Sequence, residues 1–492
     1  MAVQNWRWIR LGVCRLALMA VAAALAPTVR GQQAAVAEAE APTATLALAS
    51  MFSDAMVLQR DMDIPIWGTA EPGADVTVTL GDESAMATAD ENGRWRVAFG
   101  PLPAGGPHEL VVRTGDHSVT CDDVLIGDVW VASGQSNMEW PVAAANDAEQ
   151  EIAAANWPNI RFIDVPHQMS AEPLDSFPTQ GWVRVTPESV ARCSAVGYYF
   201  ARELQRELDV PIGLVGCNWG GTPMEAWTSR KALRSRAAFA ARVDADDAPP
   251  ANDQEAEART RAPHHRPGVL FGGMTAPVIP YAIRGVIWYQ GESNAGRHAE
   301  YAELSRLMIA DWRQRWNQGD FPFLLVQLAG WEPGGDSWPY LREAQADTLE
   351  APNVGMAVAI DIGDRTDIHP RNKQEVGRRL ALAAQAIAYG EDVPYAGPTF
   401  RDLSIDGRRA RVAFDHVYDG LRANGDLIGF EIAGADGRFV PAHAEIDGEE
   451  VVVSSDEVAE PTQVRYAWAA YPEANLRNAA GLPAVPFRSR RD

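Results

Sequence analysis

Positive charge is in short supply in this sequence, which limits the partners that the protein can bind. The 492 residues include 43 Lys and Arg against 66 Asp and Glu, so the formal net charge is −23. Nucleic acids and anionic membrane surfaces attract proteins through basic patches that neutralise phosphate groups. We therefore expect neither of them as a partner.

Long apolar runs are also lacking beyond the N-terminus. No later segment reaches the ~20 residues that a membrane-spanning helix needs, so we expect no membrane span. The shorter run LALMAVAAALA at 16–26 follows several arginines and ends in small residues, as signal peptides do. We predict a signal peptide at 1–26, a disordered Ala- and Glu-rich lead-in at 27–44, and an exported protein, periplasmic or secreted.

Cysteine is rare as well. Of the four cysteines, Cys14 lies in the predicted signal peptide, which leaves Cys121, Cys193 and Cys217. An odd number leaves at least one thiol unpaired, and all three are expected to act as small buried apolar residues. Because the chain has neither a C-x-x-C motif nor a His/Cys cluster at ligand spacing, we expect no metal and no other cofactor.

Three regions differ in their hydrophobic pattern. Residues 45–123 contain short alternating runs separated by EPG, ENG and PAGGP, which predicts an N-terminal β-sandwich. Residues 124–396 alternate apolar strands with amphipathic helices, which predicts an α/β domain with a parallel sheet covered by helices on both faces. Within it, 244–267 has the biased composition of a flexible insertion. Short β-type runs return at 397–492 and predict a C-terminal β domain.

Individual elements of the α/β region can be named from the same patterns. Five apolar runs are expected to form its strands: VLIGDVWVAS, IGLVGC, IRGVIWYQ, FPFLLVQLA and VGMAVAIDI. Helices are expected around Val196–Leu208 and at 301–316 and 372–389, where apolar residues recur at helical spacing.

Ser136 stands directly after the first of these strands, in GQSNM. Reactive groups of parallel α/β sheets gather at the carboxyl ends of the strands, so Ser136 is a candidate nucleophile. The alternative is that Ser136 caps a helix that starts near Trp140, which is a common use of serine.

A nucleophilic serine needs a base, and among the nine histidines one has the right place for it. His369 follows the fifth strand in DIGDRTDIHPRNK, with Asp367 two residues ahead of it and Pro370 stiffening the loop behind it. The alternatives are an ordinary loop histidine and a helix-capping aspartate.

Donors for an oxyanion could come from two further strand ends. Gly220 and Gly221 in CNWGGTPMEAW would let a backbone N–H approach a ligand closely. Gln290 and Asn294 in WYQGESNAG carry side-chain amides. Both stretches are also compatible with ordinary turns.

Together these motifs resemble a known family, the sialate O-acetylesterase-like branch of the SGNH/GDSL hydrolases, found among carbohydrate acetylesterases. The resemblance spans nearly the whole chain after the predicted signal peptide. It is carried by GDVWVASGQSNMEWPV, NWGGTPMEAW, PYAIRGVIWYQGESNA and DIHPRNKQEVGRRLA, with MFSDAMVLQRDMDIPIWGTAEPG near the front and NLRNAAGLPAVPFR near the end. It implies an SGNH-type three-layer α/β/α domain flanked by β-sandwich-like domains.

The resemblance also implies residue roles. Ser136 would be the nucleophile, His369 the base, and the main-chain N–H groups of Ser136 and of Gly220 or Gly221 the oxyanion donors. Asp367 fits the DIHP form of this branch as the orienting acid, with Asp364 as the rival.

The amide block departs from the family. Its usual Gly-x-Asn-Asp reads Gly-Glu-Ser-Asn at 291–294, so Gln290 or Asn294 would have to supply the amide donor.

The leading functional hypothesis is an exported carbohydrate O-acetylesterase that acts on an acetylated glycan or oligosaccharide through a serine acyl-enzyme. An SGNH esterase for other acyl esters and a non-catalytic carbohydrate-binding protein with a hydrolase-like core are the alternatives.

Overall fold

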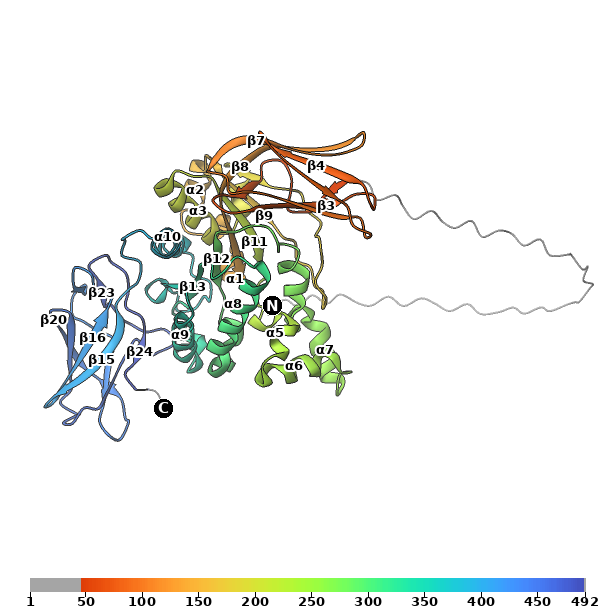
Figure 1. Cartoon of the computed structure of the whole chain (residues 1–492). Helices are drawn as coiled ribbons and strands as arrows, with labels where there is room; N and C mark the ends of the chain where they lie inside the picture. The colour runs from red at the N-terminus through yellow and green to blue at the C-terminus, as the bar shows by residue number, and fades with distance from the viewer. Residues whose placement is uncertain (1–45, 491–492) are drawn as a thin grey trace, which may run out of the picture. The chain divides into compact units, whose positions relative to one another are not determined.

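Eleven strands form the main sheet of the computed structural model, which describes residues 46–490 (Figure 1). The central path of this mixed sheet runs, in spatial order, through β10 (Val183–Val185), β9 (Trp157–Asp164), β11 (Ile212–Asn218), β8 (His117–Gly134), β12 (Gly285–Tyr289), β13 (Phe323–Gln327) and β14 (Val354–Val358). Neighbouring strands from β9 to β14 pair in parallel, and β10 joins the edge antiparallel. All five expected strands are confirmed, and β9 is added to them.

The long strand β8 belongs to two environments. Its first half pairs with β7 (Gly105–Thr114) and β2 (Val57–Gln59), and its second half with β11 and β12. The chain therefore passes the predicted boundary between 123 and 124 as one continuous strand. The change of pattern seen in the sequence marks the point where β8 becomes buried on both faces.

The N-terminal strands divide between two sheets. A three-stranded sheet contains β1 (Ala47–Leu48), β3 (Ile64–Thr69) and β6 (Arg94–Phe99). The main sheet includes β4 (Asp75–Leu80), which pairs with β7, and β5 (Glu83–Thr88), which pairs with β4. In β6 buried and exposed residues alternate, as the sequence pattern predicts.

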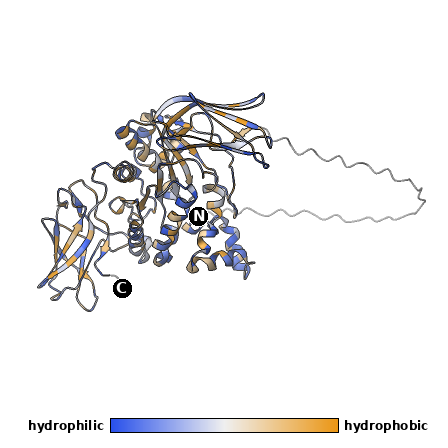
Figure 2. Ribbon diagram, in the orientation of Figure 1, coloured by the Kyte–Doolittle hydropathy of each residue, from blue (hydrophilic) through white to orange (hydrophobic). Residues whose placement is uncertain are grey.

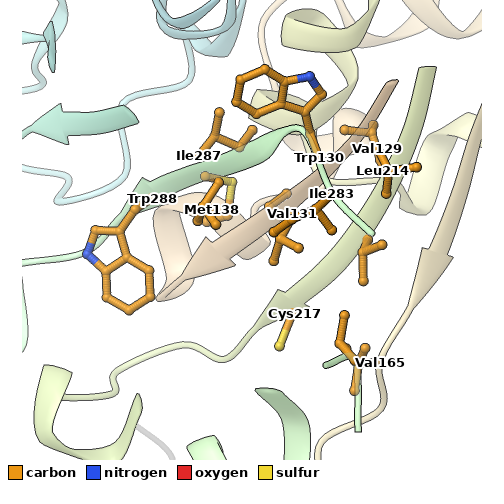
Figure 3. Close-up of a cluster of buried hydrophobic side chains, with 14 of the residues drawn as sticks. Val129, Trp130, Val131, Met138, Val165, Leu214, Cys217, Ile283, Ile287 and Trp288 are labelled. Carbon is orange, nitrogen blue, oxygen red and sulfur yellow. The ribbon is translucent and has the colours of Figure 1, made fainter. Parts of the chain in front are cut away.

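Helices cover both faces of the parallel part of the sheet. On one face α3 (Ala195–Leu208) brings Phe200 edge-on to Trp130 of β8, with ring centroids 5.0 Å apart. On the other face, α8 (Tyr301–Trp316) places the ring centroid of Trp312 6.0 Å from that of Trp288 of β12. Figure 3 shows Trp130 and Trp288 among the buried side chains of the sheet. These helices and α10 (Lys373–Tyr389) confirm the predicted helical segments. The other helical elements of this part are α1 (Ser136–Glu139), η1 (Val142–Ala144), α2 (Ala148–Ala154), η2 (Val190–Arg192), α4 (Met224–Trp227), α5 (Arg230–Arg234), η4 (Phe271–Thr275), η5 (Glu292–Glu300), η6 (Glu332–Gly334), α9 (Ser337–Asp347), η7 (Thr348–Glu350) and η8 (Ile360–Ile362).

The segment 244–267, expected to be a flexible insertion, is largely helical. It contains the end of α6 (Ala237–Asp247), the whole of α7 (Asp253–Arg261) and the short η3 (Pro263–His265). Asp246 forms ion pairs with Arg230 and Arg266, both at 2.7 Å. Alanine, glutamate and arginine favour helix, and they are frequent in this segment.

Apolar residues of the C-terminal strands form a second hydrophobic cluster. Figure 2 colours the apolar residues of these strands orange. One four-stranded sheet has the order β15 (Thr399–Asp406), β16 (Arg409–Asp415), β21 (Glu450–Ser454) and β20 (His443–Asp447); the other has β19 (Val440–Pro441), β18 (Phe430–Ala433), β22 (Gln463–Tyr466) and β24 (Phe487–Arg488). A short pair joins β17 (Leu421–Arg422) to β23 (Arg477–Asn478). Val412 and Val451 from the first sheet and Ile432 and Val464 from the second belong to this one cluster.

The three expected thiols are free and buried, as predicted. Burial raises the pKa of Cys121 to about 11 and that of Cys217 to about 12.

Between residues 46 and 490 no helix combines the length and the apolar character needed to cross a bilayer. The predicted signal peptide and lead-in, 1–44, lie outside the described residues.

Asp128 of β8 joins the central elements of the fold. Its side chain is fully buried, and the carboxylate accepts hydrogen bonds from Gln59 (2.9 Å), Arg60 (3.0 and 3.1 Å), Arg284 (3.0 Å) and Tyr389 (3.0 Å). Burial opposes ionisation, but the hydrogen bonds and charges of the two arginines outweigh it and hold the pKa of Asp128 below its usual value.

Replacing Asp128 should therefore destabilise the protein in a pH-dependent way. Asp128→Ala leaves the partly buried Arg60 and Arg284 with only the more distant, exposed Asp61 as an anion, and we expect a loss of about 3–5 kcal/mol in the free energy of unfolding at pH 7. Because the folded pKa is lowered, this contribution is present above the unfolded pKa of ~3.9 and is lost as pH falls through the folded pKa. Urea unfolding at several pH values measures it.

The control is Asp447→Ala, which removes an exposed partner of Arg411 and should cost less than about 1 kcal/mol. Equal losses in the two variants, or a loss in Asp128→Ala that does not shrink in acid, would contradict the role of Asp128.

Candidate active site

The end of β8 delivers Ser136 to the carboxyl edge of the sheet. Gly134 has a φ of +131°, and a Cβ there would lie 2.2 Å from the carbonyl oxygen of Tyr289, so only glycine fits against β12. Gln135 occupies the N-cap position and Ser136 is the first residue of α1. Ser136 therefore does not cap a helix that starts near Trp140, and that alternative is wrong.

The half-buried Ser136 contacts His369 from the other side of the site. Ser136 Oγ lies 2.9 Å from Nε2 of His369, although the two residues are 233 positions apart in the chain. Trp140 stacks on the imidazole, with ring centroids 4.9 Å apart and an interplanar angle of 18°. The predicted pairing of the first strand end with the loop after the fifth strand is thus present.

Asp367 stands behind the imidazole. Its Oδ1 lies 3.4 Å from Nδ1 of His369 and also accepts the His369 backbone N–H at 2.9 Å. Burial lowers the pKa of His369; Asp367 opposes this shift, and the charge of Lys373 adds to it. The imidazole is therefore neutral at pH 7, and Nε2 can accept the serine proton when Nδ1 carries the ring hydrogen. The N-cap of α10 is Asn372, so Asp367 is not a helix cap.

Asp364, the rival acid, is turned toward its own loop. Its Oδ1 accepts from the N–H of Thr366 (2.8 Å), the hydroxyl of Thr366 (3.0 Å) and the N–H of Asp367 (3.0 Å). These bonds close the turn that presents Asp367. The geometry favours Asp367 over Asp364 as the partner of the histidine.

Gly220 passes close to the serine, as its position after β11 predicts. A Cβ at Gly220 would lie 3.2 Å from Cβ of Ser136. Its N–H, however, donates to Oε2 of Glu139 at 2.6 Å, and Oε1 of Glu139 lies 3.2 Å from Nε2 of His167. Gly221 follows with a φ of +72° and open space around it. One of the expected oxyanion donors is thus occupied by a carboxylate.

Gln290 and Asn294 have a different place from the one expected. Both are buried; Gln290 Nε2 donates to the Thr222 carbonyl (3.2 Å) and to Asn294 Oδ1 (2.8 Å). Asn294 donates to Glu225 (2.9 Å) and accepts the Met224 N–H (3.0 Å). In this structure the two amides are not directed at Ser136. Instead they connect the loop that follows Gly220 and Gly221 to η5. The sequence could not reveal this role, because a residue type at a strand end does not show whether its side chain faces the substrate or supports a neighbouring loop.

Three functional candidates were missed by the sequence reasoning. Asn137, next to the serine, donates to Glu292 Oε1 (2.6 Å) and to the carbonyl of Ile368 (3.1 Å), the residue before His369. The buried ammonium of Lys373 donates to Asn137 Oδ1. Burial lowers the pKa of Lys373 to about 7 and raises that of Glu292. Their network ties the serine helix to the histidine loop, and only the adjacency of Asn137 to Ser136 could have indicated it.

The arrangement has the parts of a serine hydrolase: a hydroxyl on a neutral imidazole, a carboxylate behind the imidazole, and backbone N–H groups beside the hydroxyl. In the short helix α1 the N–H groups of Met138 and Glu139 donate to the Gln135 carbonyl, which leaves those of Ser136 and Asn137 as the candidate donors next to Oγ. In the described part of the chain, no group of three or more His, Cys, Asp or Glu side chains is placed to hold a metal.

Comparison with known proteins agrees with this geometry. The family model described as carbohydrate esterase, sialic acid-specific acetylesterase, matches residues 126–248 and 273–386. The sialate O-acetylesterase of Homo sapiens is 31% identical over 490 residues, covering 89% of this chain and 91% of that protein. The Mus musculus enzyme is 32% identical, covering 89% and 93%.

Among solved structures, a carbohydrate acetylesterase from Xanthomonas citri is 41% identical, with a TM-score of 0.84 over 91% of this chain and 100% of that chain. The expected resemblance is confirmed. The chain belongs to the sialic acid-specific acetylesterase family of carbohydrate esterases and is a carboxylic ester hydrolase.

Proposed function

We propose that this protein is an exported carbohydrate O-acetylesterase that removes acetyl groups from sugar hydroxyls through an acyl-enzyme on Ser136. The observation that carries the proposal is the 2.9 Å contact between Ser136 Oγ and Nε2 of His369 at the carboxyl edge of the sheet. The names of the relatives support acetylated sugars as the substrate class. Export rests on the signal-like sequence at 1–26.

Acylation starts with attack of Ser136 Oγ on the acetyl carbonyl carbon while Nε2 of His369 takes the hydroxyl proton. Asp367 stabilises the imidazolium that forms and keeps its orientation. When the tetrahedral intermediate collapses, the bond to the sugar oxygen breaks, and Nε2 returns the proton to that oxygen. The free sugar hydroxyl leaves, and the acetyl group stays on Oγ.

Deacylation repeats the same steps with water. His369 takes a proton from the water as the water oxygen attacks the acetyl carbon, and then returns it to Oγ as the acetyl–serine bond breaks. Acetate is released and Ser136 is restored.

The oxyanion would be bound by the N–H of Ser136 and that of Gly220 or Gly221. Because Glu139 occupies the Gly220 N–H, the ester oxygen has to displace this carboxylate before Gly220 can serve. Glu139 is partly exposed and also contacts His167, so the carboxylate can keep its contact with His167 after it releases the Gly220 N–H.

We also propose a domain architecture for the chain. Residues 124–396 would form an SGNH-type three-layer domain, supported by helices on both faces of the sheet. The flanking regions at 45–123 and 397–492 would be β-sandwich-like domains; in the second, two sheets contribute to one cluster.

Ser136→Ala should abolish acetate release from 4-nitrophenyl acetate. Loss of a triad serine typically lowers turnover by ~10⁴-fold or more. Because Ser136 does not cap α1, the free energy of unfolding should stay within about 1 kcal/mol of wild type. Retained turnover in the pure variant would place the nucleophile elsewhere.

Asp367→Asn should lose far more activity than Asp364→Asn. We expect kcat to fall by ~10²-fold or more, with a smaller change in KM, because the imidazolium loses its partner. Since Asp367 raises the pKa of His369, its loss should also move the acid limb of the kcat/KM profile to lower pH.

Asp364→Asn is the matched control because an asparagine Oδ1 can still accept the hydrogen bonds that close the turn. A severe loss in this variant alone would transfer the acid role to Asp364.

A further inference from the structure

A polar crevice lies beside the helix that carries Ser136. It has a volume of about 320 Å³, and its polar lining includes Glu139, Asp164, His167, Arg192, Ser194 and Asn218. A second hollow of about 420 Å³ shares Asp164 and Arg192 with the first. These two side chains therefore stand where the hollows meet.

The charged groups of Asp164 and Arg192 remain available for hydrogen bonds with a ligand. Asp164, the last residue of β9, and Arg192 of η2 line the crevice, and the side chain of neither makes a hydrogen bond or an ion pair with another residue of 46–490. The guanidinium of Arg192 lies 5.4 Å above the ring of Phe162. Burial among its neighbours raises the pKa of Asp164 to about 6, and the charge of Arg192 opposes that shift. The crevice thus offers an acceptor and a set of donors.

The backbone makes room for this carboxylate. Gly216 of β11 pairs in register with Asp164, and a Cβ at Gly216 would lie 2.3 Å from Oδ1 of Asp164. A side chain at position 216 would push the carboxylate out of its present place. The glycine and the aspartate therefore act as one feature of the crevice.

The crevice reaches the catalytic elements directly. Glu139, three residues after Ser136 on α1, lines the crevice and holds the N–H of Gly220. Ser194, another lining residue, donates to the carbonyl of Met138 at 2.6 Å. Three residues of helix rise only ~4.5 Å, so the wall of the crevice that Glu139 forms lies within one helical turn of Ser136.

We propose that this crevice is a sugar-binding subsite in which Asp164 and Arg192 bind hydroxyl groups of the glycan whose acetyl ester is held at Ser136. The inference rests on the proposed function and deepens it. A sugar hydroxyl both donates and accepts, so it can bond to the carboxylate and to the guanidinium, and bonds to charged groups are the strong ones. Since Glu139 and Asp164 place two carboxylates here against the one guanidinium of Arg192, the subsite favours an uncharged sugar over an anionic one.

The test compares a sugar ester with an ester that has no sugar. For wild type, Asp164→Ala, Arg192→Met and Gly216→Ala, kcat/KM is measured on partly acetylated xylo-oligosaccharides and on 4-nitrophenyl acetate. We expect at least a ~10-fold fall on the oligosaccharides, because a charge-assisted hydrogen bond is lost, and a change of less than about 2-fold on 4-nitrophenyl acetate. The unchanged second activity shows that each variant is folded.

The control is Asp402→Ala, an exposed aspartate of β15, which should leave both activities unchanged. An unaltered ratio of the two activities in Asp164→Ala and Arg192→Met would overturn the subsite, as would an equal fall on both substrates.

Different results would contradict the proposed function and the subsite. If the wild-type enzyme cleaves 4-nitrophenyl acetate but releases acetate from no acetylated sugar, the carbohydrate assignment falls and the subsite falls with it. If it cleaves acetylated sialic acid but not the xylo-oligosaccharides, only the subsite for an uncharged sugar is overturned.

Discussion

The close approach of β8 to β12 at Gly134 is the constraint on which the site depends. The carbonyl of Tyr289 comes so near to this position that no side chain fits, and the backbone adopts a positive φ before the chain turns into α1. Ser136 is therefore fixed by the register of two central strands, whose faces are buried under helices on both sides. A nucleophile placed in this way needs little ordering before reaction, which is the advantage of building a site on rigid elements.

The loop that carries His369 lies outside the helices and strands, and side chains hold it at several points. Asp364 closes the turn before Asp367, and Trp140 covers the imidazole. Asn137 binds the carbonyl just before His369, so the residue after the serine positions the residue before the base. The buried ammonium of Lys373 donates a hydrogen bond to Asn137. Burial disfavours the charged form of this lysine and lowers its pKa to about 7.

The sequence was most informative where one physical pattern dominates. The amphipathic repeat at 301–316 gave α8 with its bounds, and the convergence of strand ends brought Ser136 together with His369. It was least informative where the outcome depends on three-dimensional neighbours. The helices in 244–267 were not predicted from its composition. Gln290 was expected to donate to the oxyanion although it supports a loop, and the burial of Lys373 cannot be seen in a linear pattern. Such assignments depend on packing, which residue type does not encode.

The central claim is that Ser136 is the activated nucleophile, and covalent trapping tests it most directly. The enzyme is treated with a fluorophosphonate, digested and mapped by mass spectrometry, with the His369→Ala variant as the control. The account predicts one phosphonyl adduct, on the peptide that contains Ser136, a loss of acetate release in proportion to labelling, and little labelling of His369→Ala. An adduct on another residue, or full acetate release from enzyme labelled at Ser136, would contradict it.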